Sequence, residues 1–261
     1  MSGSPRLTSW ARRRRRAVAG IFTLLLLASH GPNGALATTE DDEHTAAILA
    51  DMLRAARTVV AQHQDLINDP ESADKGLTGD VVLEEATVSF REATGIDPAT
   101  LTAGSREARL MTALQESVRE VVDEHQDTIN AEGIGFKGFI PAVVGRLVSQ
   151  RFGEKAGDEA MMRVTAPFEL VRNRQLRPDA WEASVIESKL MSSDWPNGET
   201  FSTVTTVQNR EVFRVLVPEY YTAGCLACHG EPAGEIDVTG YPKEGGKLGQ
   251  LGGVISITLF R

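Results

Sequence analysis

A twelve-residue stretch of this chain occurs twice, and this repetition constrains the fold more than any other feature of the sequence. The two copies read RTVVAQHQDLIN at residues 57–68 and REVVDEHQDTIN at residues 119–130, so eight of twelve positions agree at an offset of 62 residues. A Lys-Gly pair follows each copy, at residues 75–76 and 137–138. Two copies are too few for a solenoid. They predict a duplicated helical hairpin, or two equivalent helices that pack against each other.

Apolar residues in and around both copies recur at intervals of three and four, which is the spacing of an amphipathic helix. The first helix is expected over residues 49–67, and Asp69-Pro70 ends it because the residue before a proline disfavours the helical conformation. Further helices are expected over residues 81–93, 110–129 and 136–152, the last with Pro141 in its first turn.

One histidine of each copy, His63 or His125, falls on the apolar stripe of its predicted helix. A buried imidazole needs a hydrogen-bonding partner. Each histidine is therefore predicted either as a hydrogen-bonded core residue or as a ligand to a buried group.

Beyond residue 160 the pattern becomes β-rich. An irregular strand is expected over residues 162–171, a helix over 178–191 and a closing strand over 254–260. The runs 200–208 and 211–217 predict an antiparallel hairpin around Asn209-Arg210. The predicted fold class is therefore α+β, with a helical region over residues 38–135 and an antiparallel sheet domain over residues 136–261.

The two cysteines of the chain lie in one pentapeptide, Cys225-Leu226-Ala227-Cys228-His229. This spacing is typical of covalent haem c, in which two thiols bond the vinyl groups and the adjacent imidazole binds the iron. A thioredoxin-like pair usually follows a strand of a βαβ unit, and a closed zinc site needs four ligands; neither pattern surrounds the motif. A simple loop disulfide is the remaining alternative. The motif predicts haem c bonded at Cys225 and Cys228 and ligated by His229.

The first 37 residues have the pattern of a secretory signal. A basic start at residues 12–16 precedes a short apolar core at residues 17–28 and a small-x-small cleavage site at Ala35-Leu36-Ala37. The core is short for a membrane span, and an uncleaved anchor is the alternative. The mature chain is therefore predicted to be periplasmic or otherwise exported, and not to span the membrane.

Cleavage would change the formal net charge from −9 to −15, because residues 1–37 hold six arginines and no acidic residue. An acidic chain is not expected to bind nucleic acid, whose phosphates require a basic face. The acidic surface either attracts a basic redox partner or only keeps the chain soluble.

Several segments in the second half of the chain form a pattern together with the pentapeptide. They are Phe139-Ile140-Pro141-Ala142, Arg172-Asn173, Pro178-Asp179-Ala180-Trp181-Glu182, the run 213–218 and the closing Gly-Gly-Val-Ile-Ser strand. From about Gly138 to its end, the chain resembles exported c-type haem proteins with a PAS-like fold, found alone or as sensor modules of bacterial signalling proteins. The resemblance implies that residues 136–261 form a PAS-like domain that carries the haem.

Two arginines of these segments, Arg172 and Arg174, are candidate partners for the haem propionates, because arginine binds carboxylates through paired hydrogen bonds. Surface ion pairs with nearby acidic residues are the equal alternative. Tyr220 and Tyr221 precede the motif, where they either cover a haem edge or pack in the core.

The resemblance implies a monohaem redox or small-ligand sensor, and a soluble electron-transfer carrier is the alternative. An enzymatic role is not expected, because no acid–base pair can be tied to the haem from the sequence. Related proteins can use a cysteine from a helix before the sheet as second axial ligand, but this chain has no third cysteine. His125 is the preferred replacement; His63, a methionine or an open site are the alternatives.

Overall fold

The computed structural model describes residues 38–261. The predicted signal sequence and its cleavage site lie outside the described residues. Within residues 38–261, no helix is both long enough and apolar enough to cross a membrane.

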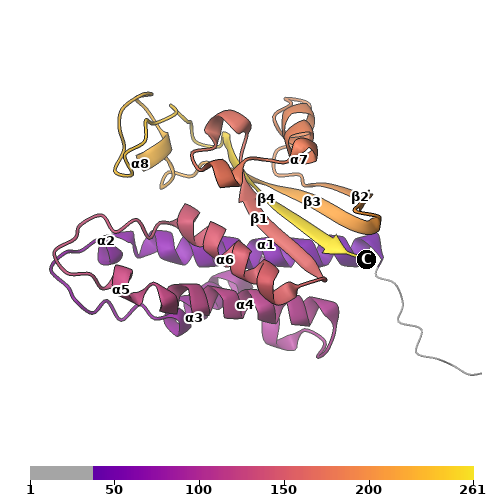
Figure 1. Ribbon diagram of the computed structural model, residues 1–261, viewed down its shortest axis with the longest axis horizontal. Helices are drawn as coiled ribbons and strands as arrows, with labels where there is room; N and C mark the ends of the chain where they lie inside the picture. Colours follow the sequence, from indigo (N-terminus) through magenta and orange to yellow (C-terminus); the bar gives the residue numbers. More distant parts are fainter. Residues whose placement is uncertain (1–37) are drawn as a thin grey trace, which may run out of the picture. The chain divides into compact units, whose positions relative to one another are not determined.

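The first part of the described chain is helical, as predicted (Figure 1). Its α-helices are α1 (Thr39–Gln62), α2 (Gln64–Ile67), α3 (Gly79–Thr94), α4 (Arg106–Glu124), α5 (Gln126–Ile129) and α6 (Pro141–Ala156). The side chains of Thr38, Thr78 and Ser105 accept first-turn N–H groups of α1, α3 and α4. The last helix begins at Pro141 rather than at residue 136. Proline is favoured at the first helical position, because the N–H that it lacks would have no partner there.

The predicted helices over residues 49–67 and 110–129 are each interrupted at their histidine. His63 separates α1 from α2, and His125 separates α4 from α5. After each break, a glutamine side chain donates to one of the last helical carbonyls, which lack intrahelical partners. These bonds run from Gln64 Nε2 to Val60 O at 3.0 Å and from Gln126 Nε2 to Val122 O at 3.1 Å.

The two copies of the repeat contact each other through their loops. The N–H of Lys75, which follows the first copy, donates to Oδ1 of Asn130 at the end of the second copy (3.0 Å). The N–H of Lys137 donates in the same way to Oδ1 of Asn68 in the first copy (3.1 Å). The helices α3 and α6 begin and end 62 residues apart, and they pack against α1 and α4 respectively. The structure therefore confirms the duplicated helical hairpin.

Four antiparallel strands form one sheet in the order β1-β4-β3-β2. They are β1 (Ala160–Thr165), β2 (Phe201–Val207), β3 (Arg210–Tyr220) and β4 (Leu251–Phe260). The predicted hairpin is present, but its turn lies at Gln208-Asn209 and not at Asn209-Arg210. Both turn residues have positive φ values, +50° and +64°, as the two-residue turn that matches strand twist requires. The α+β fold class is confirmed.

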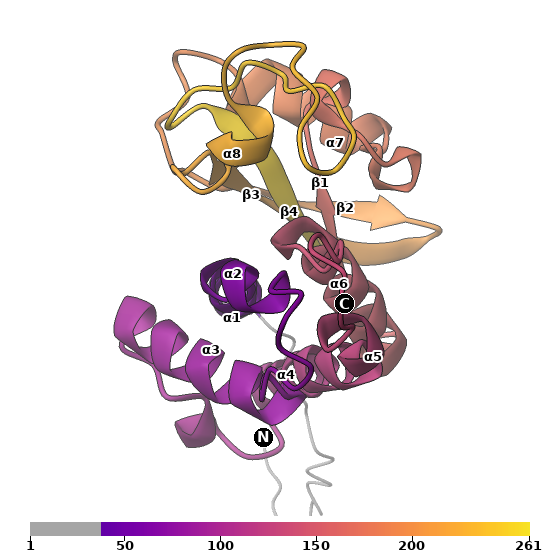
Figure 2. The same cartoon turned by 90° about the vertical axis from the view of Figure 1, so that its left-hand side faces the viewer.

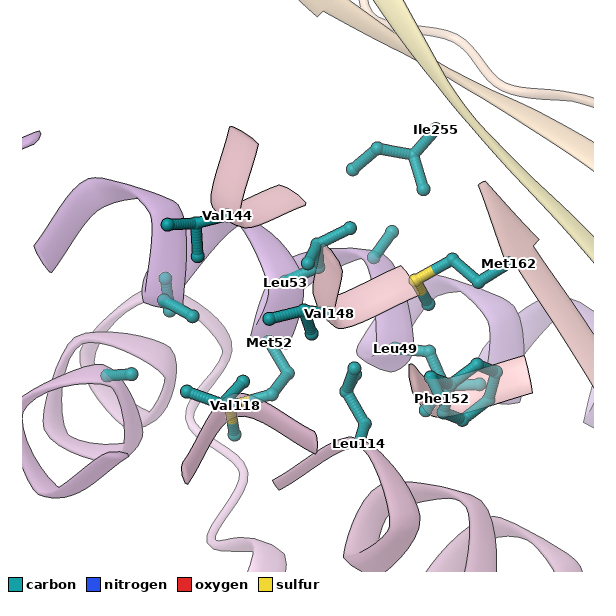
Figure 3. Packing of buried hydrophobic residues seen from close by; sticks show 14 of the residues in the cluster. Leu49, Met52, Leu53, Leu114, Val118, Val144, Val148, Phe152, Met162 and Ile255 are labelled. Atoms are coloured by element: carbon teal, nitrogen blue, oxygen red, sulfur yellow. The ribbon is translucent and has the colours of Figure 1, made fainter. Parts of the chain in front are cut away.

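One hydrophobic core joins the helices to one face of the sheet. Alternate residues of β3 and β4 face this core, as the two-residue period of a strand requires; they are Phe213, Val215, Val217, Ile255, Ile257 and Leu259. Figure 3 shows Ile255 and Met162 of the sheet together with Leu49, Val148 and Phe152 of the helices. The regions 38–135 and 136–261 therefore share a core.

The other face of the sheet carries a second, smaller core. The predicted helix over residues 178–191 is present as α7 (Ala180–Val185) and the π-helical turn η4 (Ile186–Leu190), which pack on Leu216 and Val254 of the sheet. The short helix α8 (Leu226–His229) follows β3. Figures 1 and 2 place α7 and α8 on the side of the sheet away from α1 and α6.

Candidate functional site

The predicted haem-binding pentapeptide forms the helical turn α8. The N–H groups of Cys228 and His229 both donate to the carbonyl of Cys225, at 3.2 and 3.0 Å. Residues three and four positions apart lie on the same side of a helical turn. The two thiols and the imidazole therefore share one side of α8, and both cysteines are free.

The surroundings of the cysteines differ from those of a reactive thiol pair. Burial raises the pKa of the Cys228 thiol, and the nearby Asp237 carboxylate raises it further. Redox-active and nucleophilic cysteines instead have a lowered pKa, because the thiolate is the reactive form. The Sγ atom of Cys225 lies 3.3 Å from the hydroxyl oxygen of Thr222, an uncharged neighbour. The thiol of Cys228 therefore lacks the lowered pKa of a cysteine that is activated for disulfide exchange.

The imidazole of His229 is held by a carboxylate. Its Nδ1 lies 2.8 Å from Oε2 of Glu244, and because a carboxylate only accepts, Nδ1 carries the proton. This bond leaves Nε2 as the nitrogen with a free lone pair. Burial alone would raise the pKa of Glu244, but hydrogen bonds from Arg172 and His229 outweigh burial and hold this pKa below its usual range.

An aromatic ring fixes the plane of the same imidazole. The rings of Tyr221 and His229 are stacked, with centroids 5.1 Å apart and planes 20° apart. The Tyr221 ring is buried between two glycines, since a Cβ added at Gly246 or Gly252 would lie 2.6 or 2.3 Å from it. Burial and the negative charge of Glu244 raise the pKa of Tyr221 to about 12, so its hydroxyl stays protonated.

Arg172 connects the motif to the loop that follows it. Its guanidinium donates to both carboxylate oxygens of Glu244 (2.7 and 2.9 Å), to Oδ2 of Asp237 (2.6 Å) and to the carbonyl of Cys228 (2.9 Å). The side chain of Asp237 is fully buried, and its hydrogen bonds overcome the effect of burial and lower its pKa. Arg172 thus forms ion pairs, but they are largely buried and not the surface pairs that the alternative predicted. Its predicted contact with a propionate stays a prediction.

The other two predicted site residues lie apart from this network. Arg174 is exposed at the start of the 3₁₀ turn η3 (Arg174–Leu176). His125 is half-buried in the helical layer, where its Nδ1 donates to the carbonyl of Val121 (2.7 Å). Its ring packs beside that of Phe139, with the two ring centroids 5.3 Å apart. Its counterpart His63 bonds to Glu85. Both histidines thus have the hydrogen bonds of core residues, and ligation of the haem iron by His125 stays a prediction.

Sequence reasoning missed Asp237, Glu244 and the two glycines around Tyr221. All lie in or next to the glycine-rich stretch between α8 and β4. The signal that could have found them is a pair of acidic residues in a glycine-rich loop directly after the motif. Nothing in the sequence, however, pairs those residues with an arginine that lies more than sixty positions earlier.

The loop after α8 also exposes apolar side chains. Ile236, Val238 and Leu248 are 62, 60 and 71% exposed. The two thiols and Nε2 of His229, on one side of α8, fit a macrocycle with a metal centre that is bonded through two thioethers and one imidazole.

Comparison with known families matches residues 35–259 to the family described as Tll0287-like. No curated protein and no solved structure matches the chain. The matched residues include the helices α1 to α7, the turn α8, the strands β1 to β3 and all of β4 except its last residue.

Proposed function

Because this match covers most of the chain, the protein belongs to the Tll0287-like family, and we propose that it carries one haem c and acts as a redox or small-ligand sensor. The family is one of c-type haem sensor proteins, which supports the proposal. The observation that carries it is the turn α8, where two free thiols and an imidazole with Nδ1 already bonded share one side.

In this proposal each side chain of the turn has one role. Cys225 and Cys228 form thioether bonds, and Nε2 of His229 binds the iron. The buried contacts of Glu244 and Tyr221 fix the orientation of the His229 ring before any ligand is present. The bound haem would supply a one-electron iron couple and a second axial position for a small ligand. We propose no enzymatic role.

A connection between the site and the helices favours a sensor over an electron carrier. Glu219 binds Arg54 and Arg57 of α1, each at 2.5 Å, and its side chain is only 18% exposed. The strand β3 bulges directly after Glu219, and Tyr221 stacks on His229 two residues later. A displacement of His229 therefore has a short path to α1, through the stacked Tyr221 ring, the backbone of residues 219–221 and the ion pairs of Glu219, and a carrier does not need such a path.

The covalent link is tested by replacing both cysteines with alanine. The Cys225→Ala/Cys228→Ala double variant should lose the haem stain on a denaturing gel. Thr222→Ala is the matched control, because Thr222 contacts Cys225 but forms no thioether bond. Haem stain that survives in the double variant would exclude this attachment site.

An absorption spectrum with and without CO separates the two candidate functions. A sensor with an open or displaceable axial position should bind CO in the reduced state, whereas a carrier with two firmly bound protein ligands should not. The His125→Ala variant tests the proposed second ligand. If the ferric wild type is low-spin and the variant remains so, His125 is only a core residue.

We also propose export to the periplasm. Mass spectrometry of protein from the native host should then show loss of the first 37 residues. An intact N-terminus in the membrane fraction would instead indicate an anchor. The acidic mature chain would suit a basic redox partner.

A further inference from the structure

The carboxylate behind His229 has a consequence for the reduction potential. We propose that Glu244 is a positioning residue that makes His229 a stronger donor to the iron and thereby stabilises the ferric state, while Arg172 limits this effect. The inference rests on the proposed haem ligation, and it deepens the proposed function by assigning the residues that set the redox range of the sensor.

The geometry fixes which nitrogen binds the iron. A ligating histidine usually donates its second N–H to a carboxylate, a carbonyl or water, and this bond fixes the tautomer and raises the basicity of the ligand. Here the acceptor is a full carboxylate, 2.8 Å from Nδ1. The ring cannot rotate freely away from it, because Tyr221 is stacked on one face and the N–H of Gly246 holds the His229 carbonyl at 2.6 Å.

The carboxylate of Glu244 is largely buried, so its charge acts strongly on the His229 imidazole. The side chains of Glu244 and Arg172 are 17 and 18% exposed, so water screens their charges only in part. A negative charge at the back of the imidazole favours the more positive oxidation state of the iron.

Arg172 acts in the opposite direction. It binds both oxygens of Glu244 and so withdraws part of the negative charge that reaches His229. Asp237, fully buried on the other side of the guanidinium, shares that positive charge. The donor strength of His229 therefore depends on how one arginine divides its charge between two carboxylates.

The test is a redox titration of the intact haem protein and its Glu244→Gln variant. Glutamine keeps the shape and an acceptor oxygen but removes the charge. At a fixed applied potential, the ferrous-to-ferric ratio should rise by tenfold or more, which is about 59 mV for a one-electron couple. Loss of a partner that contacts a metal ligand changes metal affinity or activity by roughly 10- to 100-fold, which is an effect of comparable size.

Glu235→Gln is the matched control. Glu235 lies in the same loop and pairs with Lys243, but does not contact His229. It removes the same charge from the protein and should leave the potential close to that of the wild type. If Glu244→Gln shifts the potential no more than Glu235→Gln, the inference is overturned.

A second variant guards against misfolding. Glu244→Asp keeps the charge but is one methylene shorter, and its potential should lie between those of the wild type and Glu244→Gln. If neither variant yields a folded haem protein, Glu244 only braces the loop, and its assigned effect on the potential is rejected. A wild type without covalent haem would instead refute the proposed function, and the gel stain distinguishes that failure from this one.

Discussion

Replacement of Gly252 with alanine should displace the Tyr221 ring from its position beside His229. The added methyl group would lie 2.3 Å from Cε1 of Tyr221, whereas carbon atoms in contact are ordinarily about 3.5–4.0 Å apart. The opposite edge of the ring faces the backbone of Gly246, where an added Cβ would lie 2.6 Å away. The ring therefore cannot make room by moving sideways.

The expected cost follows from this overlap of more than 1 Å. One extra methyl group in a packed core typically costs about 1–3 kcal/mol. We expect about 2–3 kcal/mol, the upper part of this range, because Gly252 lies in β4 and the ring is enclosed on both edges. Gly252 does not have a positive φ, so alanine adds no backbone strain and the loss measures the contact itself. A loss of about 2.8 kcal/mol lowers the ratio of folded to unfolded protein about a hundredfold.

Urea unfolding of the wild type and three variants tests this reasoning. Gly252→Ala should unfold at a clearly lower urea concentration than the wild type. Gly224→Ala should not, because its added Cβ would have no neighbour nearer than 4.0 Å. Adding Tyr221→Leu to Gly252→Ala should restore part of the lost stability. Equal midpoints for the two glycine variants would refute the tight packing around Tyr221.

Three other perturbations have outcomes that the structure specifies. Tyr221→Phe should raise the free energy of unfolding by about 1 kcal/mol, because the buried hydroxyl has no hydrogen-bond partner within residues 38–261; a loss in thermal unfolding would mean that a water serves it. Glu219→Gln should cost about 2 kcal/mol, because two arginines of α1 lose a largely buried partner. Glu120→Gln should cost less, because the Glu120 side chain is 35% exposed and that of Glu219 only 18%; equal urea midpoints would contradict this. Burial would raise the pKa of Asp179, but its bonds to the first turn of α7 and to an arginine of β3 outweigh burial and hold this pKa below 3.8. Its charge therefore stabilises the fold above pH 3.8, and this contribution disappears as the pH falls through the lower folded-state value. Asparagine at position 179 keeps the cap but has no charge. As the pH is lowered, the free energy of unfolding of Asp179→Asn should therefore fall less than that of the wild type. Parallel curves of this free energy against pH would show that the charge is irrelevant.

The helices and the hairpin could be predicted because their signals are local. The three-and-four spacing and Pro141 both act within a few residues of the element they specify. The breaks at His63 and His125 could not be predicted, because the glutamine after each break also bonds to the segment that follows the other copy, at Phe139 or Leu77.

The candidate site could likewise be predicted only in part. The pentapeptide could be identified because one helical turn brings its thiols and imidazole together. The partner of His229 could not, because Glu244 reaches it only after a long glycine-rich loop has folded back. The acidic partners of Arg172 depend on that same loop, which has no periodic pattern from which a contact could be inferred.

The reciprocal bonds between the repeat copies have the form of a homodimer interface. Lys75 binds Asn130 while Lys137 binds Asn68, as residues related by a two-fold axis do. The helical layer is thus equivalent to two subunits fused into one chain. Subunits of a homodimer must change together, whereas fused copies can diverge. Here the first hairpin ends at α3 and leads to the second copy, while the equivalent helix α6 leads directly into β1, so only one of the two copies continues into the sheet that bears α8.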